Sequence, residues 1–202
     1  MNGSLRHVAP RDCRYLSFDF QPGKSVDVIL DDPYVLPFDD SSCDVIVSSS
    51  YFEHAEFLWL SFNEMLRILK PFGLLYLNVP SNGAFHRFPV DCWRFYPDSG
   101  ATWQNWGRRN VYPVEMLESF TGVQKRDIWN DFVRVFARGA AHGEAYPNRM
   151  QHRVGRYTNG RLAGTDAIYD LSALPEDKRL VAGLIKLLAG RLLRRLTAGR
   201  AG

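Results

Sequence analysis

Residues 43–80 read CDVIVSSSYFEHAEFLWLSFNEMLRILKPFGLLYLNVP, and this stretch decides the fold class. It opens with a short β-branched run and continues into a segment whose apolar residues recur at helical spacing: Leu58, Phe62, Met65, Leu66 and Leu69. The helical pattern ends at residues 70–73, because proline cannot continue a helix and glycine permits a reversal. The run GLLYLNVP that follows is apolar enough to be covered on both faces. Strand, helix and strand in this order predict a βαβ unit of a parallel sheet.

The segments on either side extend this pattern. Upstream, CRYLSFDF and SVDVIL are predicted strands separated by the turn signal QPGK. Downstream, residues 81–100 form a long aromatic and charged loop, and VEMLESF at 114–120 is predicted to be a short helix. Two β-like runs at 121–129 and 131–138 then predict an antiparallel hairpin that closes the sheet.

The composition indicates a globular protein with one main domain. The chain has 202 residues, of which 46% are hydrophobic, and it contains no apolar run long enough to cross a membrane. The N-terminus lacks the apolar core of a secretion signal, so we expect a cytoplasmic protein. Its three cysteines show neither a disulfide framework nor zinc-ligand spacing.

The charge is distributed unevenly along the chain. Residues 1–133 carry 12 Lys and Arg against 17 Asp and Glu, whereas residues 134–202 carry 13 against 5. We therefore predict an acidic body at 1–138, a basic Gly- and Arg-rich linker or arm at 139–174, and a basic amphipathic helix at 175–202. That helix could pack on its own domain, form a homodimer or lie on an anionic membrane surface. Nucleic-acid binding is disfavoured, since the aromatic residues lie in the acidic body.

Three motifs in a fixed order resemble the class I S-adenosylmethionine-dependent methyltransferases of the type 11 branch. They are DDPYVLPFDDSSCDVIVSS at 31–49, YFEH at 51–54 and EMLRILKPFGLLYLNVP at 64–80, with Phe72 where the family usually has glycine. The resemblance implies an α/β fold with a Rossmann-like methyltransferase sheet, mostly parallel with a C-terminal antiparallel hairpin. The family's first strand and most of its glycine-rich turn have no counterpart, so we expect a sheet lacking the usual first strand, between the strands ending at Asp19 and beginning near Cys43. We expect the natural protein to start further upstream.

The resemblance implies S-adenosyl-L-methionine as the cofactor and gives its contacts. Asp19 ends a predicted strand, where a carboxylate can accept hydrogen bonds from ribose hydroxyls, although it could equally be a solvated turn residue. Asp32 would accept the adenine amine, and the later aspartates 39, 40 and 44 would form a solvated turn. The full set of predicted cofactor-binding residues is Gly3, Asp19, Asp32, Pro33, Ser48 and Ser49.

His54 is the candidate general base, because a histidine side chain titrates near neutral pH and this one would lie close to the methyl donor. The alternative is a structural role, with the Glu53–His54 pair bonding to backbone. No metal site is expected, since the acidic residues of the 31–44 segment lack a His or Glu at ligand spacing.

The loop at 82–98 is the predicted substrate wall. Its candidate substrate-binding residues are His86, Arg87, Asp91, Trp93 and Arg94, whose side chains suit saccharides or phosphorylated acceptors. In the alternative, Trp93 and Phe95 pack the loop onto the body while Arg94 pairs with Asp91 or Asp98.

Two functions follow from these patterns. The first is methyl transfer from S-adenosyl-L-methionine to a small-molecule or saccharide-type acceptor, which a looser resemblance of HRFPVDCWRFYPDSG links to cell-surface polysaccharide synthesis. The second is a non-catalytic methyltransferase-fold binding or accessory protein that has lost cofactor binding.

Overall fold

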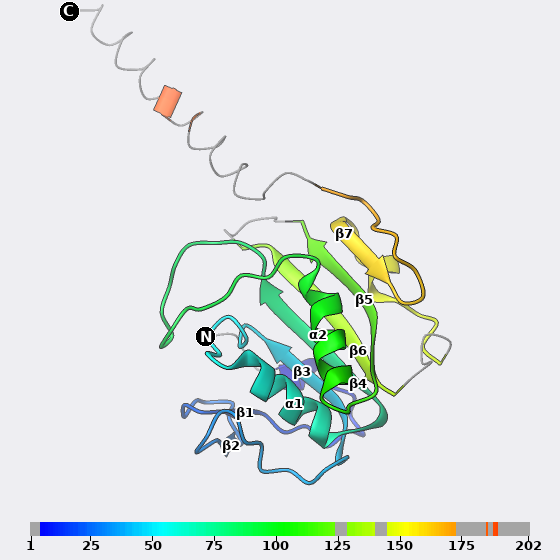
Figure 1. The fold of residues 1–202 in the computed structure, drawn as a ribbon. Helices are drawn as coiled ribbons and strands as arrows, with labels where there is room; N and C mark the ends of the chain where they lie inside the picture. The colour runs from blue at the N-terminus through cyan, green and yellow to red at the C-terminus, as the bar shows by residue number, and fades with distance from the viewer. Residues whose placement is uncertain (1–4, 124–128, 140–144, 173–184, 186–187, 190–202) are drawn as a thin grey trace, which may run out of the picture.

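The fold is described from a computed structural model of the 202-residue chain. It describes residues 5–123, 129–139, 145–172, 185 and 188–189. The elements of this part, shown in Figure 1, are listed here in chain order: η1 (Leu5–Val8), β1 (Phe18–Asp19), β2 (Val28–Ile29), β3 (Cys43–Ser49), α1 (Leu58–Ile68), β4 (Leu69–Pro80), α2 (Ser99–Arg109), β5 (Val114–Gly122), β6 (Asp131–Arg138), η2 (Met150–His152) and β7 (Tyr157–Leu162).

The predicted βαβ unit is confirmed. Strands β3 and β4 are parallel neighbours, and α1 connects them along one face of the sheet. The helix buries the side chains of Phe62, Met65 and Leu66, which the helical spacing had placed on one face. Their burial against β4 and α2 stabilises the helix, since most helical stability in proteins comes from packing of an apolar face.

The described strands form two sheets. Strands β1 and β2 pair in parallel as a small two-stranded sheet, while the other five follow the order β3-β4-β6-β5-β7. Beyond β4 every pairing in the larger sheet is antiparallel, including the β5–β6 hairpin. The α/β class and a C-terminal antiparallel hairpin are therefore confirmed. The first strand of the hairpin is 114–122, however, and not the predicted 121–129.

Residues 114–120 are a strand and not the predicted short helix, so that prediction was wrong. The segment VEMLESF belongs to β5, which hydrogen-bonds to β6 on one side and to β7 on the other. Nearly all of its residues are buried, so both faces of the strand are covered. Burial between two neighbouring strands outweighs the helical propensity of Glu, Met and Leu here.

The segment predicted as a linker or arm, 139–174, also contains ordered structure. Its strand β7 forms the edge of the large sheet, and the short helix η2 precedes it. The carboxylate of Glu118 on β5 accepts hydrogen bonds from the backbone N–H groups of Met150 and Gln151, at 2.7 and 3.0 Å. The sheet therefore extends into the basic part of the chain.

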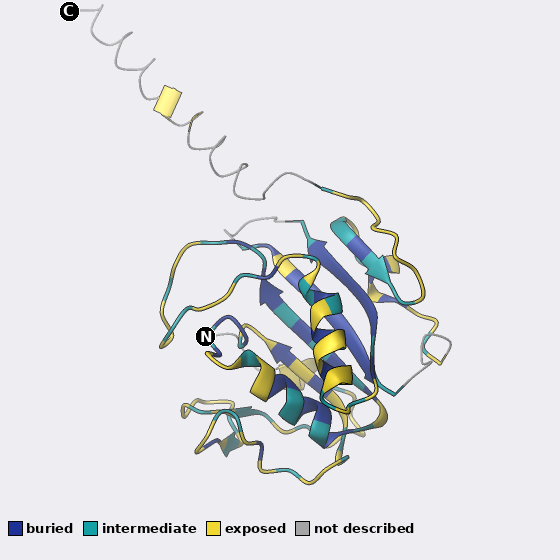
Figure 2. Ribbon diagram, viewed as in Figure 1, coloured by how far each residue is buried: buried dark blue, intermediate teal, exposed yellow. Residues whose placement is uncertain are grey.

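The core lies between the sheet and the helices α1 and α2, which cover the same face (Figures 1 and 2). Phe62 packs edge-on against Trp103 and Phe136, with ring centroids 5.0 and 5.4 Å apart. Arg134 on β6 lies in this core with no exposed surface, and its guanidinium stacks over the ring of Trp103 at 4.0 Å. Burial away from water lowers the pKa of Arg134 to about 9.

Strands β1 and β3 belong to different sheets, and β3 pairs only with β4 among the described residues. The outer edge of β3 is consequently unpaired within that part of the chain, and its Val45 and Val47 are 59% and 46% exposed. Strand edges of this kind are usually paired or blunted by charge.

Candidate functional site

Glu64 and Arg67 of α1 hold the segment 31–40 against the helix. Glu64 accepts a hydrogen bond from the Leu36 N–H at 2.9 Å, and Arg67 donates to the carbonyls of Leu36 and Phe38 at 2.9 and 2.8 Å. Arg67 also pairs with Glu64 at 2.7 Å, which lowers the pKa of the Glu64 carboxyl. The Leu-Pro-Phe backbone is thereby held in place at the carboxyl end of β2. Asp40 in this loop, predicted to be solvated, is exposed and pairs with Arg67 at 2.7 Å.

Two predicted cofactor contacts, Asp19 and Asp32, come together beside Tyr51. Both carboxylates are exposed, and each accepts one local N–H bond, from Gln21 at 3.0 Å and from Tyr34 at 2.8 Å. Burial raises the pKa of Tyr51, and repulsion from both carboxylates adds to the rise. The two acids therefore lie near enough to the half-buried Tyr51 phenol to act on it, at the carboxyl ends of parallel strands.

The other predicted cofactor residues have mixed placement. Ser48 and Ser49 end β3, the first buried and the second exposed. The Pro33 carbonyl accepts a hydrogen bond from the Tyr51 hydroxyl at 3.1 Å. Gly3 lies outside the described residues.

His54 is largely enclosed. Its side chain is 12% exposed, its Nδ1 lies 2.5 Å from the Val90 carbonyl and its Nε2 lies 3.8 Å from Glu53 Oε1. A carbonyl oxygen only accepts hydrogen bonds. Nδ1 therefore carries a proton and donates a hydrogen bond to the Val90 carbonyl. These contacts match the structural alternative for the Glu53–His54 pair, and catalysis by His54 stays a prediction.

Glu53, which the sequence suggested only as a structural partner of His54, is a buried titratable group. It is 3% exposed, and its Oε2 has no hydrogen-bond partner among the described residues. Burial raises the pKa of Glu53 to about 7, which backbone hydrogen bonding and the nearby Arg94 and His86 only partly offset. Its place beside a candidate base in the YFEH motif was the signal that could have identified it.

The loop at 82–98 is held by its own charged residues. Arg94 donates two hydrogen bonds to Asp91, at 2.5 and 2.8 Å, and a third to the Ala84 carbonyl at 3.0 Å. The N–H of His86 also donates to Asp91, at 2.8 Å. This pairing lowers the pKa of Asp91 to about 2. The alternative in which Arg94 pairs with Asp91 is thus the observed one.

The same loop is attached to the YFEH segment. The Glu53 carbonyl accepts the N–H groups of Cys92 and Trp93 at 2.7 and 3.2 Å, and the Trp93 indole donates to the Ala55 carbonyl at 2.8 Å. Of the predicted substrate-binding residues, Arg87 is exposed and makes no ion pair among the described residues.

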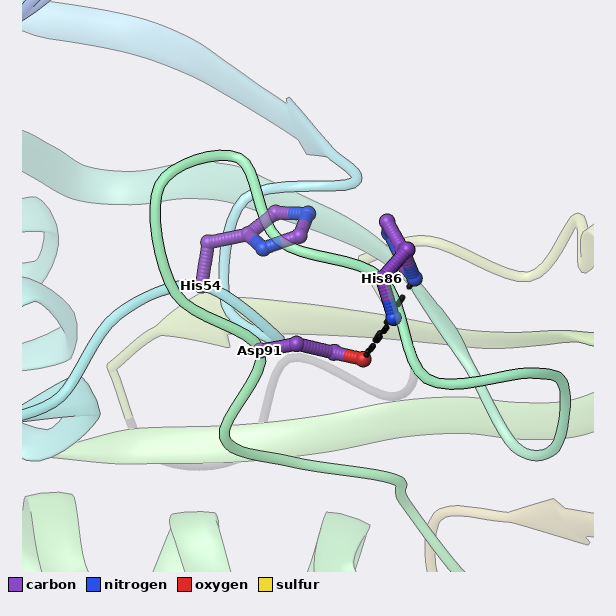
Figure 3. Close-up of side chains that lie close together, drawn as sticks. All are labelled: His54, His86 and Asp91. Carbon is purple, nitrogen blue, oxygen red and sulfur yellow. Dashed lines mark hydrogen bonds and ion pairs between the residues drawn. The ribbon is translucent and has the colours of Figure 1, made fainter.

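His54, His86 and Asp91 are grouped in Figure 3, with candidate metal-ligand atoms within 4.8 Å of one another. Both oxygens of Asp91 already accept hydrogen bonds from Arg94, and the Nδ1 of His54 is used by Val90. A cationic guanidinium bound to the same carboxylate opposes a second cation, so we assign this cluster to holding the loop.

The exposed acids Asp19 and Asp32 fit the polar groups of the nucleoside of S-adenosyl-L-methionine. The exposed carboxylates of Asp19 and Asp32 each retain an oxygen without a hydrogen bond among the described residues, and ribose hydroxyls and an exocyclic amine are donors of the kind they need. The glycine turn that would face them includes Gly3, outside the described part.

Comparison with known proteins gives one family and many solved structures. The model of the methyltransferase domain family matches residues 9–77. No curated protein matches the chain. Similar structures include the putative methyltransferase in complex with the Trm112 activator from Haloferax volcanii (18% identity, TM-score 0.43) and a SAM-dependent methyltransferase from Thermotoga maritima, described as a possible histamine N-methyltransferase (17%, TM-score 0.42). They cover 61% and 56% of this chain.

A third similar structure is the 1,6-didemethyltoxoflavin-N1-methyltransferase of Burkholderia thailandensis with bound substrate and S-adenosylhomocysteine, at 11% identity and a TM-score of 0.46. The similar region covers 60% of this chain and 60% of that protein. For the first two structures it covers 65% and 64% of the other protein, so this chain spans less than two thirds of the length of each of the three. The family match spans β1, β2, β3, α1 and most of β4, the elements that carry the three motifs. The family model therefore supports a methyltransferase domain over residues 9–77.

Proposed function

We propose that the chain is an S-adenosyl-L-methionine-dependent methyltransferase acting on a small-molecule or saccharide-type acceptor. The observation that carries the proposal is the convergence of Asp19 and Asp32 beside Tyr51 at the carboxyl ends of β1 and β2. Ligands of open α/β sheets bind at this edge. Localisation in the cytoplasm and a role in cell-surface polysaccharide synthesis belong to the same proposal.

The cofactor would supply a methyl group on a positively charged sulfur, which is already a good leaving group. The task of the protein is then to bind, orient and exclude water. In this proposal Asp19 and Asp32 hold the nucleoside, and Ser48 and Ser49 let it lie against the end of β3. His54, if it takes the acceptor's proton, must do so through Nε2, because Nδ1 is engaged with Val90.

The acceptor would lie between the YFEH segment and the loop at 82–98. Both terminal nitrogens of Arg94 are bound to Asp91, so in this proposal Arg87 and the Nε2 of His86 make the direct contacts with the acceptor. A homodimer or membrane contact through the C-terminal helix stays a proposal too, and that segment lies outside the described residues apart from 185 and 188–189.

Calorimetric titration of the full chain with S-adenosylhomocysteine tests the cofactor assignment. We expect Asp32→Ala to weaken binding by about tenfold or more, since hydrogen bonds to charged groups contribute roughly 1.5–3 kcal/mol. Asp31→Ala is the matched control, because Asp31 is an exposed neighbour whose side chain makes no hydrogen bond among the described residues, and the affinity of this variant should equal that of the wild type.

A folded wild-type sample that shows no heat of binding would reject the enzyme and favour the non-catalytic accessory protein. If binding is seen, turnover of His54→Ala decides the role of that residue: unchanged turnover removes His54 from the mechanism.

A further inference from the structure

The loop at 82–98 exposes two phenylalanines that no other part of the described structure covers. Phe85 is 76% exposed and Phe88 is 72% exposed, and Tyr96 on the same loop is 71% exposed. Single exposed apolar residues are common on protein surfaces, but several large ones on one loop mark an interaction site.

This exposure belongs to an ordered loop. Before Phe88, the His86 N–H donates to Asp91 and the Ala84 carbonyl accepts from Arg94. After Phe88, the His54–Val90 bond and the two N–H bonds to the Glu53 carbonyl hold the backbone. The Phe88 ring itself lies 5.6 Å from that of His86 and 6.5 Å from that of His54. A segment held by so many contacts presents Phe85 and Phe88 in a fixed arrangement.

Further aromatic rings continue this surface onto the start of α1. Phe57, Trp59 and Trp93 are 48%, 37% and 36% exposed, and successive ring centroids lie 6.1 and 6.5 Å apart. The Trp93 indole N–H points inward, to the Ala55 carbonyl. We call the six residues the aromatic edge: Phe57, Trp59, Phe85, Phe88, Trp93 and Tyr96.

The charge beside Phe85 and Phe88 is positive. The loop at 82–98 carries four charged side chains besides His86, of which Asp91 pairs with Arg94 and Asp98 pairs with Arg161 from β7. Arg87 remains, between the two phenylalanines, and makes no ion pair among the described residues.

We propose that the aromatic edge docks on a lipid bilayer with anionic headgroups, with Phe85 and Phe88 entering the interface and Arg87 contacting lipid phosphate. Side chains more than 70% exposed protrude from the surface, whereas a small ligand needs a concave site that buries most of it. Aromatic rings beside a cationic side chain suit the boundary between headgroups and hydrocarbon. This proposal gives Arg87 to lipid in place of the acceptor contact proposed above, and in all other respects it does not depend on the methyltransferase assignment.

Vesicle flotation of the full chain tests this docking. Wild-type protein should float with vesicles of phosphatidylglycerol and phosphatidylcholine in equal parts. The partition coefficient of the double variant F85S/F88S should be lower by a factor of at least about ten. Arg87→Gln should lower binding to these vesicles about fivefold and leave the weaker binding to pure phosphatidylcholine unchanged.

Phe72→Ser is the matched control, because Phe72 is also exposed, at 59%, but lies at the opposite end of β4. It should bind as the wild type does. A second reporter, Phe85→Trp, keeps the aromatic edge and should shift its fluorescence to shorter wavelength with vesicles, while Phe72→Trp should not. Failure of the wild type to float, undiminished flotation of F85S/F88S, or an unshifted Phe85→Trp would each overturn the proposal.

Discussion

Glu53 shows how a single buried acid can make the stability of the domain depend on pH. The residue lies under the loop at 82–98, with its Oε2 unpaired and its pKa raised to about 7 by burial. Since the pKa is higher in the folded than in the unfolded state, the folded protein retains this proton over a range in which the unfolded chain has lost it. Stability therefore falls as the pH rises from about 4.5 to about 7.

We predict that Glu53→Gln removes this fall, because an amide of similar shape stays neutral. The free energy of unfolding of the wild type should drop by about 3 kcal/mol relative to Glu53→Gln between pH 4.5 and pH 8. Urea unfolding of both proteins at several pH values measures the difference. Glu56→Gln is the control, as Glu56 is exposed, and it should follow the wild type at every pH. Parallel curves for the wild type and Glu53→Gln would contradict the assignment.

At the residue scale, strand-end acids were easier to predict than loop residues. Asp19 and Asp32 follow short apolar runs, so their position at the carboxyl edge could be inferred from the chain order alone. The partners of Asp91 could not, since pairing with Arg94 or contact with a substrate leaves the same sequence pattern. The burial of Arg134 could not be predicted either, because the alternating pattern of DFVRVFAR allows this residue to lie on a buried or on an exposed face of the strand.

At the element scale, the irregular first part of β4 depends on two neighbouring residues. A Cβ on Gly73 would lie 2.8 Å from the Leu69 side chain and 2.9 Å from the Asp44 carbonyl oxygen, so only glycine fits there. Phe72, before it, has a φ of 66°, in the left-handed region that disfavours residues with a Cβ. The register between β3 and β4 shifts here: Cys43 pairs with Leu69, but Val45 pairs with Leu74, so β4 holds extra unpaired residues that include Phe72 and Gly73.

We predict that Phe72→Gly raises the free energy of unfolding by about 1 kcal/mol, since glycine adopts the left-handed conformation without the steric cost. The ring contributes little, being 59% exposed. Phe72→Ala separates the two effects, because alanine removes the ring but keeps the unfavourable backbone conformation. Thermal and urea unfolding should show stabilisation for glycine only, and equal stability of the two variants would argue against backbone strain.

Element types were predicted best where periodicity is long and local. The strand at 43–49 and the helix that begins at Leu58 match the structure because their patterns span many residues. Strand β5 was mistaken for a helix because its burial on both faces hides the alternation of a strand. Helix α2 carries few apolar residues and had been given no element, although Trp103 anchors it in the core.

At the scale of the whole molecule, the acidic body and part of the basic segment form one sheet. The charge change near residue 134 suggested a boundary, yet β7 pairs with β5 across it. The charge composition of a segment indicates how well its side chains are solvated. The pairing of β7 with β5 depends instead on backbone hydrogen bonds, which charged side chains do not prevent, so the composition could not predict it. Within the described residues, no helix is both long and apolar enough to span a membrane.

If β7 and η2 are part of the folded domain, weakening their attachment should destabilise all of it. Glu118 is 2% exposed and accepts the N–H groups of Met150 and Gln151, so Glu118→Ala removes two hydrogen bonds to a buried carboxylate. We predict a loss of about 3 kcal/mol in one cooperative unfolding transition, followed by both circular dichroism and tryptophan fluorescence. Glu56→Ala, at an exposed site, should leave the midpoint unchanged. A loosely attached arm would instead give an unchanged main transition in Glu118→Ala, or an earlier separate step seen by circular dichroism alone.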